Sequence, residues 1–139
     1  MRQVPNTTCW IGNARDYGAH RELFDRGIEA VVQLAAEEPV IATPRELMCF
    51  RLPLLDGAGN DPARLKLAIN VVAQLIAAGI PTLVSCSAGM SRSPAIVAAA
   101  LAQVEQADVG EVLLRVIADG PREVSAALWR EILQLVRRG

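Results

Sequence analysis

The chain has 139 residues, 52% of them apolar, and its 14 basic and 15 acidic side chains give a formal net charge of −1. This size and apolar content predict one compact domain over residues 1–139. A charge near zero lacks the basic excess of nucleic-acid-binding proteins, no apolar run is long enough to span a bilayer, and no N-terminal apolar stretch is typical of a secretion signal. We therefore expect a monomeric cytoplasmic protein that neither binds nucleic acid nor inserts into membranes.

Strands and helices alternate along the chain. In chain order the predicted elements are a strand at Thr8–Ile11, a helix at about Arg15–Arg26, strands at Ala30–Leu34 and Cys49–Leu52, a helix from Pro62 to Gly79, a strand at Thr82–Ser85, and helices at about Ser93–Val104, Val109–Ala118 and Ser125–Arg137. Alternation of this kind predicts an α/β fold with a central, mostly parallel sheet flanked by helices.

The residues after the strand Thr82–Ser85 carry the strongest chemical signal. Cys86 opens a turn that contains Gly89 and closes on Arg92, where a helix is predicted to begin. A loop of this length lets backbone N–H groups converge on one anion, and the positive end of the helix dipole points to the same place. This setting favours a thiolate at Cys86, and the guanidinium of Arg92 can hold two phosphoryl oxygens. We predict a nucleophile in a phosphate-binding loop; the alternative is a buried core thiol.

A general acid is expected on a loop that can reach the leaving oxygen of a phosphate ester. The segment before the Pro62 helix offers two carboxylates, Asp56 and Asp61. Asp56 follows a strand-like run and precedes Gly57 and Gly59, which suit a flexible loop, so it is the predicted acid; a turn-forming role is the alternative. Asp61 directly precedes Pro62, a pattern typical of a helix N-cap.

These residues resemble those of a known family. CSAGMSRS at Cys86–Ser93 matches the signature loop of the small dual-specificity phosphatases, which belong to the cysteine-based protein tyrosine phosphatase superfamily. The segments WIGNARD, GIEAVVQLA and PREVS lie where that family has similar segments, and a mid-chain loop preceded by a carboxylate favours the dual-specificity branch. The resemblance implies a protein tyrosine phosphatase-like fold and hydrolysis of phosphotyrosine and phosphoserine or phosphothreonine in proteins through a phosphocysteine intermediate, with no metal or cofactor.

The resemblance also implies roles for individual residues. Cys86 would attack phosphorus, Asp56 would transfer the proton, Arg92 would bind the phosphoryl group, and the hydroxyl of Ser93 would stabilise the departing thiolate. The implied phosphate-binding residues are Ser87, Ala88, Gly89, Met90, Ser91 and Arg92. Inorganic phosphate and vanadate are expected inhibitors. Arg122 falls where some relatives carry an arginine that meets a second anionic group; a surface charge is the alternative.

The chain departs from the family at one position beside the nucleophile. Most members have histidine there, whereas this chain has Ser85, whose hydroxyl cannot supply a positive charge. His20, the chain's one histidine, is predicted to be an ordinary helix residue. The stretch from Ala36 to Met48, with Glu37 and Glu38, is expected to form a variable wall beside the pocket.

Two other functions stay open at this point. The chain could be a phosphate-binding module without catalysis, or a phosphatase for a phosphoinositide, although the loop interior lacks the extra lysines of phosphoinositide phosphatases. The three cysteines cannot all pair, and a reactive thiol suits a reducing compartment. Cys9 and Cys49 are candidates to form a disulfide with Cys86 on oxidation, but buried thiols in or beside strands are the favoured interpretation.

Overall fold

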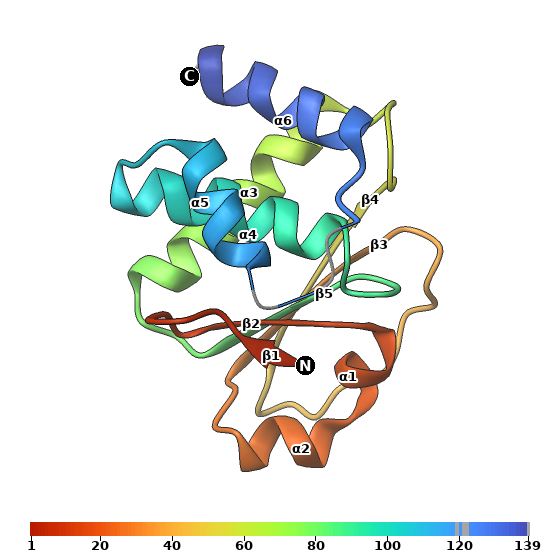
Figure 1. The fold of residues 1–139 in the computed structure, drawn as a ribbon. Coiled ribbons are helices and arrows are strands. Elements are labelled where there is room, and N and C mark those ends of the chain that lie inside the picture. The colour runs from red at the N-terminus through yellow and green to blue at the C-terminus, as the bar shows by residue number, and fades with distance from the viewer. Residues whose placement is uncertain (119, 121–122, 139) are drawn as a thin grey trace.

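The computed structural model describes residues 1–118, 120 and 123–138. In chain order its elements are β1 (Arg2–Gln3), β2 (Cys9–Gly12), α1 (Ala14–Gly18), α2 (His20–Asp25), β3 (Ala30–Ala35), β4 (Met48–Leu54), α3 (Pro62–Ala77), β5 (Thr82–Ser85), α4 (Arg92–Glu105), α5 (Val109–Ile117) and α6 (Ala126–Arg138). The strands form one sheet in the order β1-β2-β5-β3-β4, in which β1 is antiparallel to β2 and the other pairs are parallel (Figure 1). The predicted α/β fold with a mostly parallel sheet flanked by helices is confirmed.

Helices cover both faces of the sheet. Side chains alternate along a strand, so Val32 and Val84 join the core under α3, α4, α5 and α6, whereas Val31 and Leu83 join a second core with α1 and α2. Figure 1 shows these two groups of helices on either side of the sheet. Every residue of β3 and β5 is buried, which fits the apolar majority of β3, while the polar residues Gln33, Thr82 and Ser85 are buried with them.

The parallel strands end at one edge of the sheet. The register pairs Ser85, the last residue of β5, with Gly12, the last residue of β2, and with Gln33 of β3. The loops after β2, β3, β4 and β5 therefore meet at this edge, as expected for ligand sites of parallel sheets. Asp56 follows β4 and Cys86 follows β5, so both lie here.

Three elements differ from those predicted. The helix expected at Arg15–Arg26 is two short helices, because Ala19 between them has a nonhelical backbone (φ −85°, ψ 64°). β1 was not predicted, since a two-residue strand carries almost no sequence pattern. β4 is longer than predicted and includes Pro53. β4 is an edge strand, where the missing proline N–H need not break a ladder hydrogen bond.

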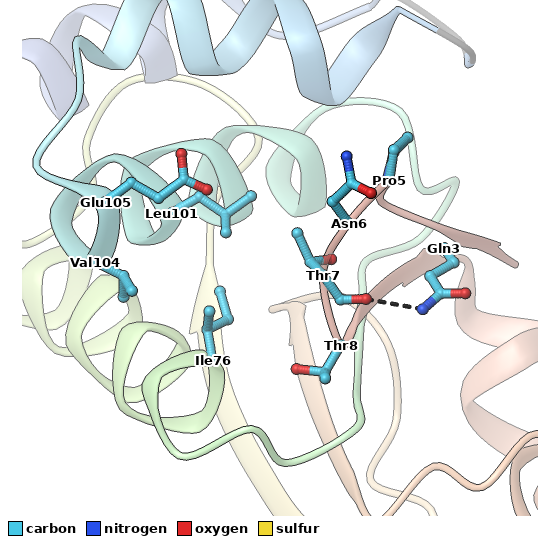
Figure 2. A pocket seen from close by; sticks show the side chains of 9 residues that line it. All are labelled: Gln3, Pro5, Asn6, Thr7, Thr8, Ile76, Leu101, Val104 and Glu105. Atoms are coloured by element: carbon cyan, nitrogen blue, oxygen red, sulfur yellow. Dashed lines mark hydrogen bonds between the residues drawn. The ribbon is translucent and has the colours of Figure 1, made fainter.

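The opposite edge of the sheet carries an open hollow of about 560 Å³ (Figure 2). It is lined by residues before β2 and by the ends of α3 and α4, and Gln3 Nε2 donates to the Thr7 carbonyl across its rim (2.8 Å). Glu105 is the charged residue of this lining, which contains no cysteine or basic residue. The hollow therefore lacks the groups needed to bind and attack a phosphate. Separately, no helix in the described part of the chain is both long and apolar enough to cross a membrane.

The N-terminus of α3 yields a stability prediction. Asp61 caps this helix as predicted, since its Oδ1 accepts from the Ala63 N–H (3.0 Å) and Pro62 follows it. We expect Asp61→Ala to lower the free energy of unfolding by about 1 kcal/mol, because the capping hydrogen bond is lost. Asp61→Asn can still cap and should stay close to the wild type. Urea denaturation measures both variants, and equal losses would contradict the capping role.

Candidate active site

Cys86 lies at the floor of a small cavity. Its side chain is only 2% exposed, and its backbone N–H donates to the Gly12 carbonyl at 3.3 Å. Its Sγ accepts the N–H of Gly89 at 3.3 Å. Glu37, Asp56, Glu123 and residues 86–88 and 90–92 line the cavity, which has a volume of about 170 Å³.

The turn after Cys86 requires glycine at its centre. Gly89 has a positive φ of 73°, and a Cβ there would lie 2.9 Å from the Gly12 carbonyl oxygen. Any other residue here would have both a strained backbone and a steric clash between its Cβ and the Gly12 carbonyl. The turn between β2 and α1 supports the loop on this side, where the Ala14 N–H donates to the Ser87 carbonyl (3.2 Å). The predicted phosphate-binding loop is thus held closely against the end of β2.

The loop presents several free hydrogen-bond donors. Within the described part of the chain, no hydrogen bond engages the backbone N–H groups of Ser87, Ala88, Met90, Ser91 and Arg92. They lie between the sulfur of Cys86 and the first turn of α4, whose dipole adds positive potential. The predicted phosphate-binding residues therefore offer the donors that an anion needs, with Gly89 N–H directed to sulfur instead.

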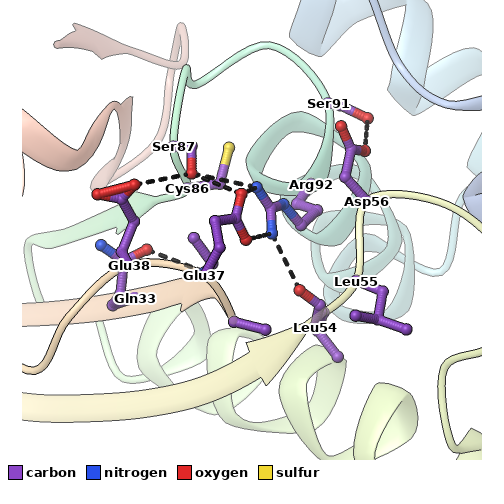
Figure 3. A network of polar contacts seen from close by, with 12 residues as sticks. Gln33, Glu37, Glu38, Leu54, Leu55, Asp56, Cys86, Ser87, Ser91 and Arg92 are labelled. Atoms are coloured by element: carbon purple, nitrogen blue, oxygen red, sulfur yellow. Dashed lines mark hydrogen bonds and ion pairs between the residues drawn. The ribbon is translucent and has the colours of Figure 1, made fainter.

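Arg92 is buried, and one edge of its guanidinium is occupied. The residue is 3% exposed. Its Nη1 donates to Glu37 Oε1 (2.6 Å) and to the Leu54 carbonyl (3.0 Å), and its Nη2 donates to Glu37 Oε2 (Figure 3). Nη2 also lies 3.4 Å from Ser87 Oγ. Nε is buried without a hydrogen-bond partner among the described residues. Glu37 therefore holds the Nη1–Nη2 edge, and the buried Nε–H is left without an acceptor among the described residues.

The ion pair keeps both partners charged. The hydrogen bond from Arg92 lowers the pKa of Glu37 to about 2 even though burial acts in the opposite direction, and Glu37 in turn raises the pKa of Arg92. The hydroxyl of Ser87 also contacts Glu37 (2.7 Å) and Glu38 (3.1 Å). The sequence interpretation placed both glutamates in a pocket wall but missed the pairing of Glu37 with Arg92. Its one sequence signal is the presence of two adjacent acidic residues after a buried strand.

Asp56 faces the loop from the segment between β4 and α3. Its Oδ1 lies 2.6 Å from Ser91 Oγ, and Figure 3 shows the two side chains directed at one another. The Ser91 hydroxyl also accepts the backbone N–H of Ser125 (2.8 Å). Asp56 and Cys86 line the same cavity, so the structure brings the predicted acid and nucleophile together.

The segment that carries Asp56 is tied down by hydrogen bonds. The side chain of Asn60 bridges it, accepting from the Leu55 N–H (2.8 Å) and donating to the Leu55 carbonyl (3.0 Å). Glu131 of α6 accepts from the Gly59 N–H (3.0 Å) and from the backbone N–H of Asn60 (3.3 Å). Sequence reasoning expected a flexible loop from its glycines. It missed the bridge by Asn60, which lies within the segment, and the contact from Glu131, which lies 72 residues from Gly59.

The remaining predicted residues fall in different places. Ser93 and Ser85 are fully buried, and neither hydroxyl has a partner among the described residues, so the expected contact of Ser93 with the sulfur is not formed. His20 is the first residue of α2, and its Nε2 is buried without a hydrogen-bond partner among the described residues, which differs from the ordinary helix residue that was predicted. Arg122 lies outside the described residues. Within the described ranges, no group of three His, Cys, Asp or Glu residues could hold a metal ion.

The other two cysteines lie away from Cys86. Cys9 is fully buried, and burial raises its pKa to about 12. It pairs with Thr82 in the register, and the four residues from there to Cys86 span about 13 Å, beyond disulfide reach. Cys49 is exposed, contrary to expectation, and contacts the Tyr17 hydroxyl (3.0 Å). It lies on edge strand β4, two strands from β5, so neither thiol can pair with Cys86 in this fold.

Comparisons with known proteins give both a family and a fold. A family model described as "Tc-R-P: Polymorphic toxin system, DSP-PTPase phosphatase" matches residues 10–106. Human DUSP28 has a TM-score of 0.82 at 23% identity, over 95% of this chain and 93% of that one. A mouse putative dual specificity phosphatase complexed with zinc tungstate has a TM-score of 0.78 at 24% identity, over 94% and 83%. No curated protein matches the sequence.

A third solved structure shares the fold at a lower sequence identity. The human tyrosine phosphatase-like serine/threonine/tyrosine-interacting protein has a TM-score of 0.77 at 16% identity, over 94% of this chain and 92% of that one. At such low identities these likenesses show the shared architecture, and the residues of the site must be argued from their own geometry.

The Glu37–Arg92 pair predicts how stability depends on pH. The pKa of Glu37 falls from 4.5 to about 2 on folding, so the pair stabilises fully above pH 4.5 and less as the pH falls toward 2. The free energy of unfolding should therefore decrease more steeply between about pH 5 and pH 3 in the wild type than in Glu37→Gln. Urea denaturation at each pH measures this slope.

A neighbouring carboxylate provides the control for that experiment. Glu38 contacts the Ser87 hydroxyl but has no hydrogen bond to Arg92, so Glu38→Gln should follow the wild-type slope more closely. At neutral pH, Glu37→Gln should also unfold more easily, because the buried cation loses its charged partner. Parallel curves for the wild type and Glu37→Gln would show that the ion pair does not form in solution.

Proposed function

The chain belongs to the polymorphic toxin system DSP-PTPase phosphatase family, and on this premise we propose that it hydrolyses phosphomonoesters in proteins through a phosphocysteine intermediate. One arrangement carries the proposal. The sulfur of Cys86 lies at the floor of a cavity, beside backbone N–H groups without acceptors and a buried arginine whose Nε–H is free. A phosphoryl group placed there would meet a nucleophile and its charge-neutralising donors together.

The first step would transfer the phosphoryl group to sulfur. The Cys86 thiolate attacks phosphorus, an S–P bond forms and the ester P–O bond breaks. Asp56 gives its proton to the departing oxygen, which leaves as an alcohol or phenol. The loop N–H groups and Arg92 stabilise the charge that spreads over the three equatorial oxygens. Support for these roles comes from the shared cavity of Cys86, Asp56 and Arg92.

The second step would regenerate the enzyme. Water attacks the phosphorus of the phosphocysteine, the S–P bond breaks, and the Asp56 carboxylate takes the proton of the attacking water. Phosphate and the Cys86 thiolate are the products. The buried hydroxyl of Ser93, which has no other partner among the described residues, is available to donate to the departing sulfur once its side chain rotates.

The composition of the loop supports a proposal for the substrate class. The loop interior from Ser87 to Ser91 contains no lysine or arginine, and Glu37 already neutralises Arg92. This charge balance suits a single phosphate on a protein side chain better than a polyphosphorylated inositol ring. We therefore propose phosphotyrosine and phosphoserine or phosphothreonine residues as substrates.

Hydrolysis of an aryl phosphate in the presence of a chelator tests the proposed activity. We expect turnover in the wild type and its loss in Cys86→Ser and in Arg92→Ala, because attack and charge binding both disappear. Vanadate and phosphate should inhibit competitively and raise the Tm of the wild type, since both bind the folded loop. Tight vanadate binding without turnover would instead indicate a binding module.

The role of Asp56 predicts a dependence on the leaving group. Asp56→Asn should reduce turnover by about 10² to 10⁴ for esters with basic leaving groups, and less for acidic phenols, which depart without a proton. Steady-state kinetics on a series of substituted phenyl phosphates measures the trend. Asp61→Asn is the matched control, because Asp61 caps α3 and does not line the cavity. A larger loss in Asp61→Asn would move the general acid to that residue.

A further inference from the structure

We propose that Ser91 is a positioning residue that determines which carboxyl oxygen of Asp56 carries the transferable proton. The proposal rests on the proposed function, in which Asp56 is the general acid. It deepens that function because it assigns a task to a hydroxyl in the phosphate-binding loop other than contact with phosphate.

The hydrogen-bond geometry around Ser91 leaves little freedom. Ser91 is 6% exposed, and its Oγ lies 2.6 Å from Asp56 Oδ1 and 2.8 Å from the backbone nitrogen of Ser125. The amide N–H must be the donor in the second contact, so it occupies one lone pair of the hydroxyl. Within the described chain, Ser91 Oγ has no third partner.

The single proton of the Ser91 hydroxyl then decides which partner is the donor in the contact between Ser91 Oγ and Asp56 Oδ1. If the Asp56 proton were on Oδ1 and donated to Ser91, the hydroxyl proton would be left without a protein acceptor, since Ser91 Oγ has no other partner in the described chain. An unsatisfied buried donor costs more than a typical hydrogen bond contributes. Ser91 therefore donates to Oδ1, and the proton of the acid form of Asp56 is placed on Oδ2, the oxygen free to face a leaving group.

The local backbone supports this assignment. Ser91 is the N-cap residue of α4, a position where a serine hydroxyl usually accepts from an N–H of the first turn. Here it makes no such contact, and its backbone (φ −128°, ψ −73°) is atypical for a cap. The hydroxyl is thus directed away from its own helix toward Asp56, which leaves the first N–H groups of α4 to an anion.

The amide that orients Ser91 is itself well anchored. Ser125 precedes α6, and its Oγ accepts the N–H of Leu128 (3.3 Å). Leu128 and Ile132 on this helix are completely buried in the main core. Glu131, on the same helix, binds the backbone of the segment that carries Asp56. One helix therefore fixes both the acid's loop and the hydroxyl that orients the acid.

A positioning role makes a prediction that loss of stability alone does not. Proton transfer matters most when the leaving group is basic, so misplacing the proton should slow those esters selectively. We expect the ratio of kcat/KM for a nitro-substituted phenyl phosphate to that for phenyl phosphate to rise about tenfold or more in Ser91→Ala. An unchanged ratio in a variant that still binds vanadate would overturn the proposal.

A matched pair of variants separates the hydroxyl from side-chain size. Ser91→Thr keeps a hydroxyl and Ser91→Val replaces it with a methyl of similar shape, so any strain from branching is shared. We expect Thr to keep the wild-type ratio and Val to show the raised ratio. This pair decides the question even if Ser91→Ala does not fold, and equal ratios for Thr and Val would overturn the proposal.

A double-mutant cycle distinguishes failure of this proposal from failure of the proposed function. If Ser91 acts through Asp56, Ser91→Ala should cause no further change in the ratio in an Asp56→Asn background. An additive effect would overturn the positioning role while leaving Asp56 as the acid. If Asp56→Asn alone shows no dependence on the leaving group, the assignment of Asp56 fails first, and the proposal for Ser91 fails with it.

Discussion

A buried guanidinium must find acceptors for its protons, and in this fold Arg92 finds them on segments that follow three different strands. It binds Glu37 after β3, the carbonyl of Leu54 at the end of β4, and Ser87 after β5. A buried cation without such partners would strongly destabilise the fold. The parallel sheet places these three strand ends side by side, and Arg92 bonds to a group at each of them, while its Nε–H is left without an acceptor among the described residues.

The acid side of the cavity depends on a second support, α6. Its Glu131 accepts from the backbone of the segment that carries Asp56, and the Ser125 amide before the helix donates to Ser91 Oγ, which contacts Asp56 Oδ1. The match to the family model ends at residue 106, before this helix begins. Cys86 and the loop that follows it therefore lie within the range that matches the family model, whereas the surroundings of Asp56 are completed by a helix outside that range.

The sequence predicts most of the fold and the turn from Cys86 to Arg92, because both depend on neighbouring residues. Buried strands, the cap at Asp61 and the turn from Cys86 to Arg92 all have local signatures. The partners of these residues do not, since Glu37 and Glu131 meet the site across 55 and 72 residues of chain. Local pattern also failed at Ala19, where one nonhelical residue divides a continuous helical pattern.

The pairing of Arg92 with Glu37 also affects the rate at which a phosphorylated substrate would reach the cavity. Glu37 is about half exposed while Arg92 is buried, so an approaching dianion first meets a paired charge in place of a bare cation. At physiological ionic strength the field of such a dipole is screened within about 8 Å. Long-range steering is thus weak, encounter is governed by ordinary diffusion, and attraction begins only once the phosphate is inside the cavity. Discrimination among phosphorylated surfaces then depends on short-range fit at the rim.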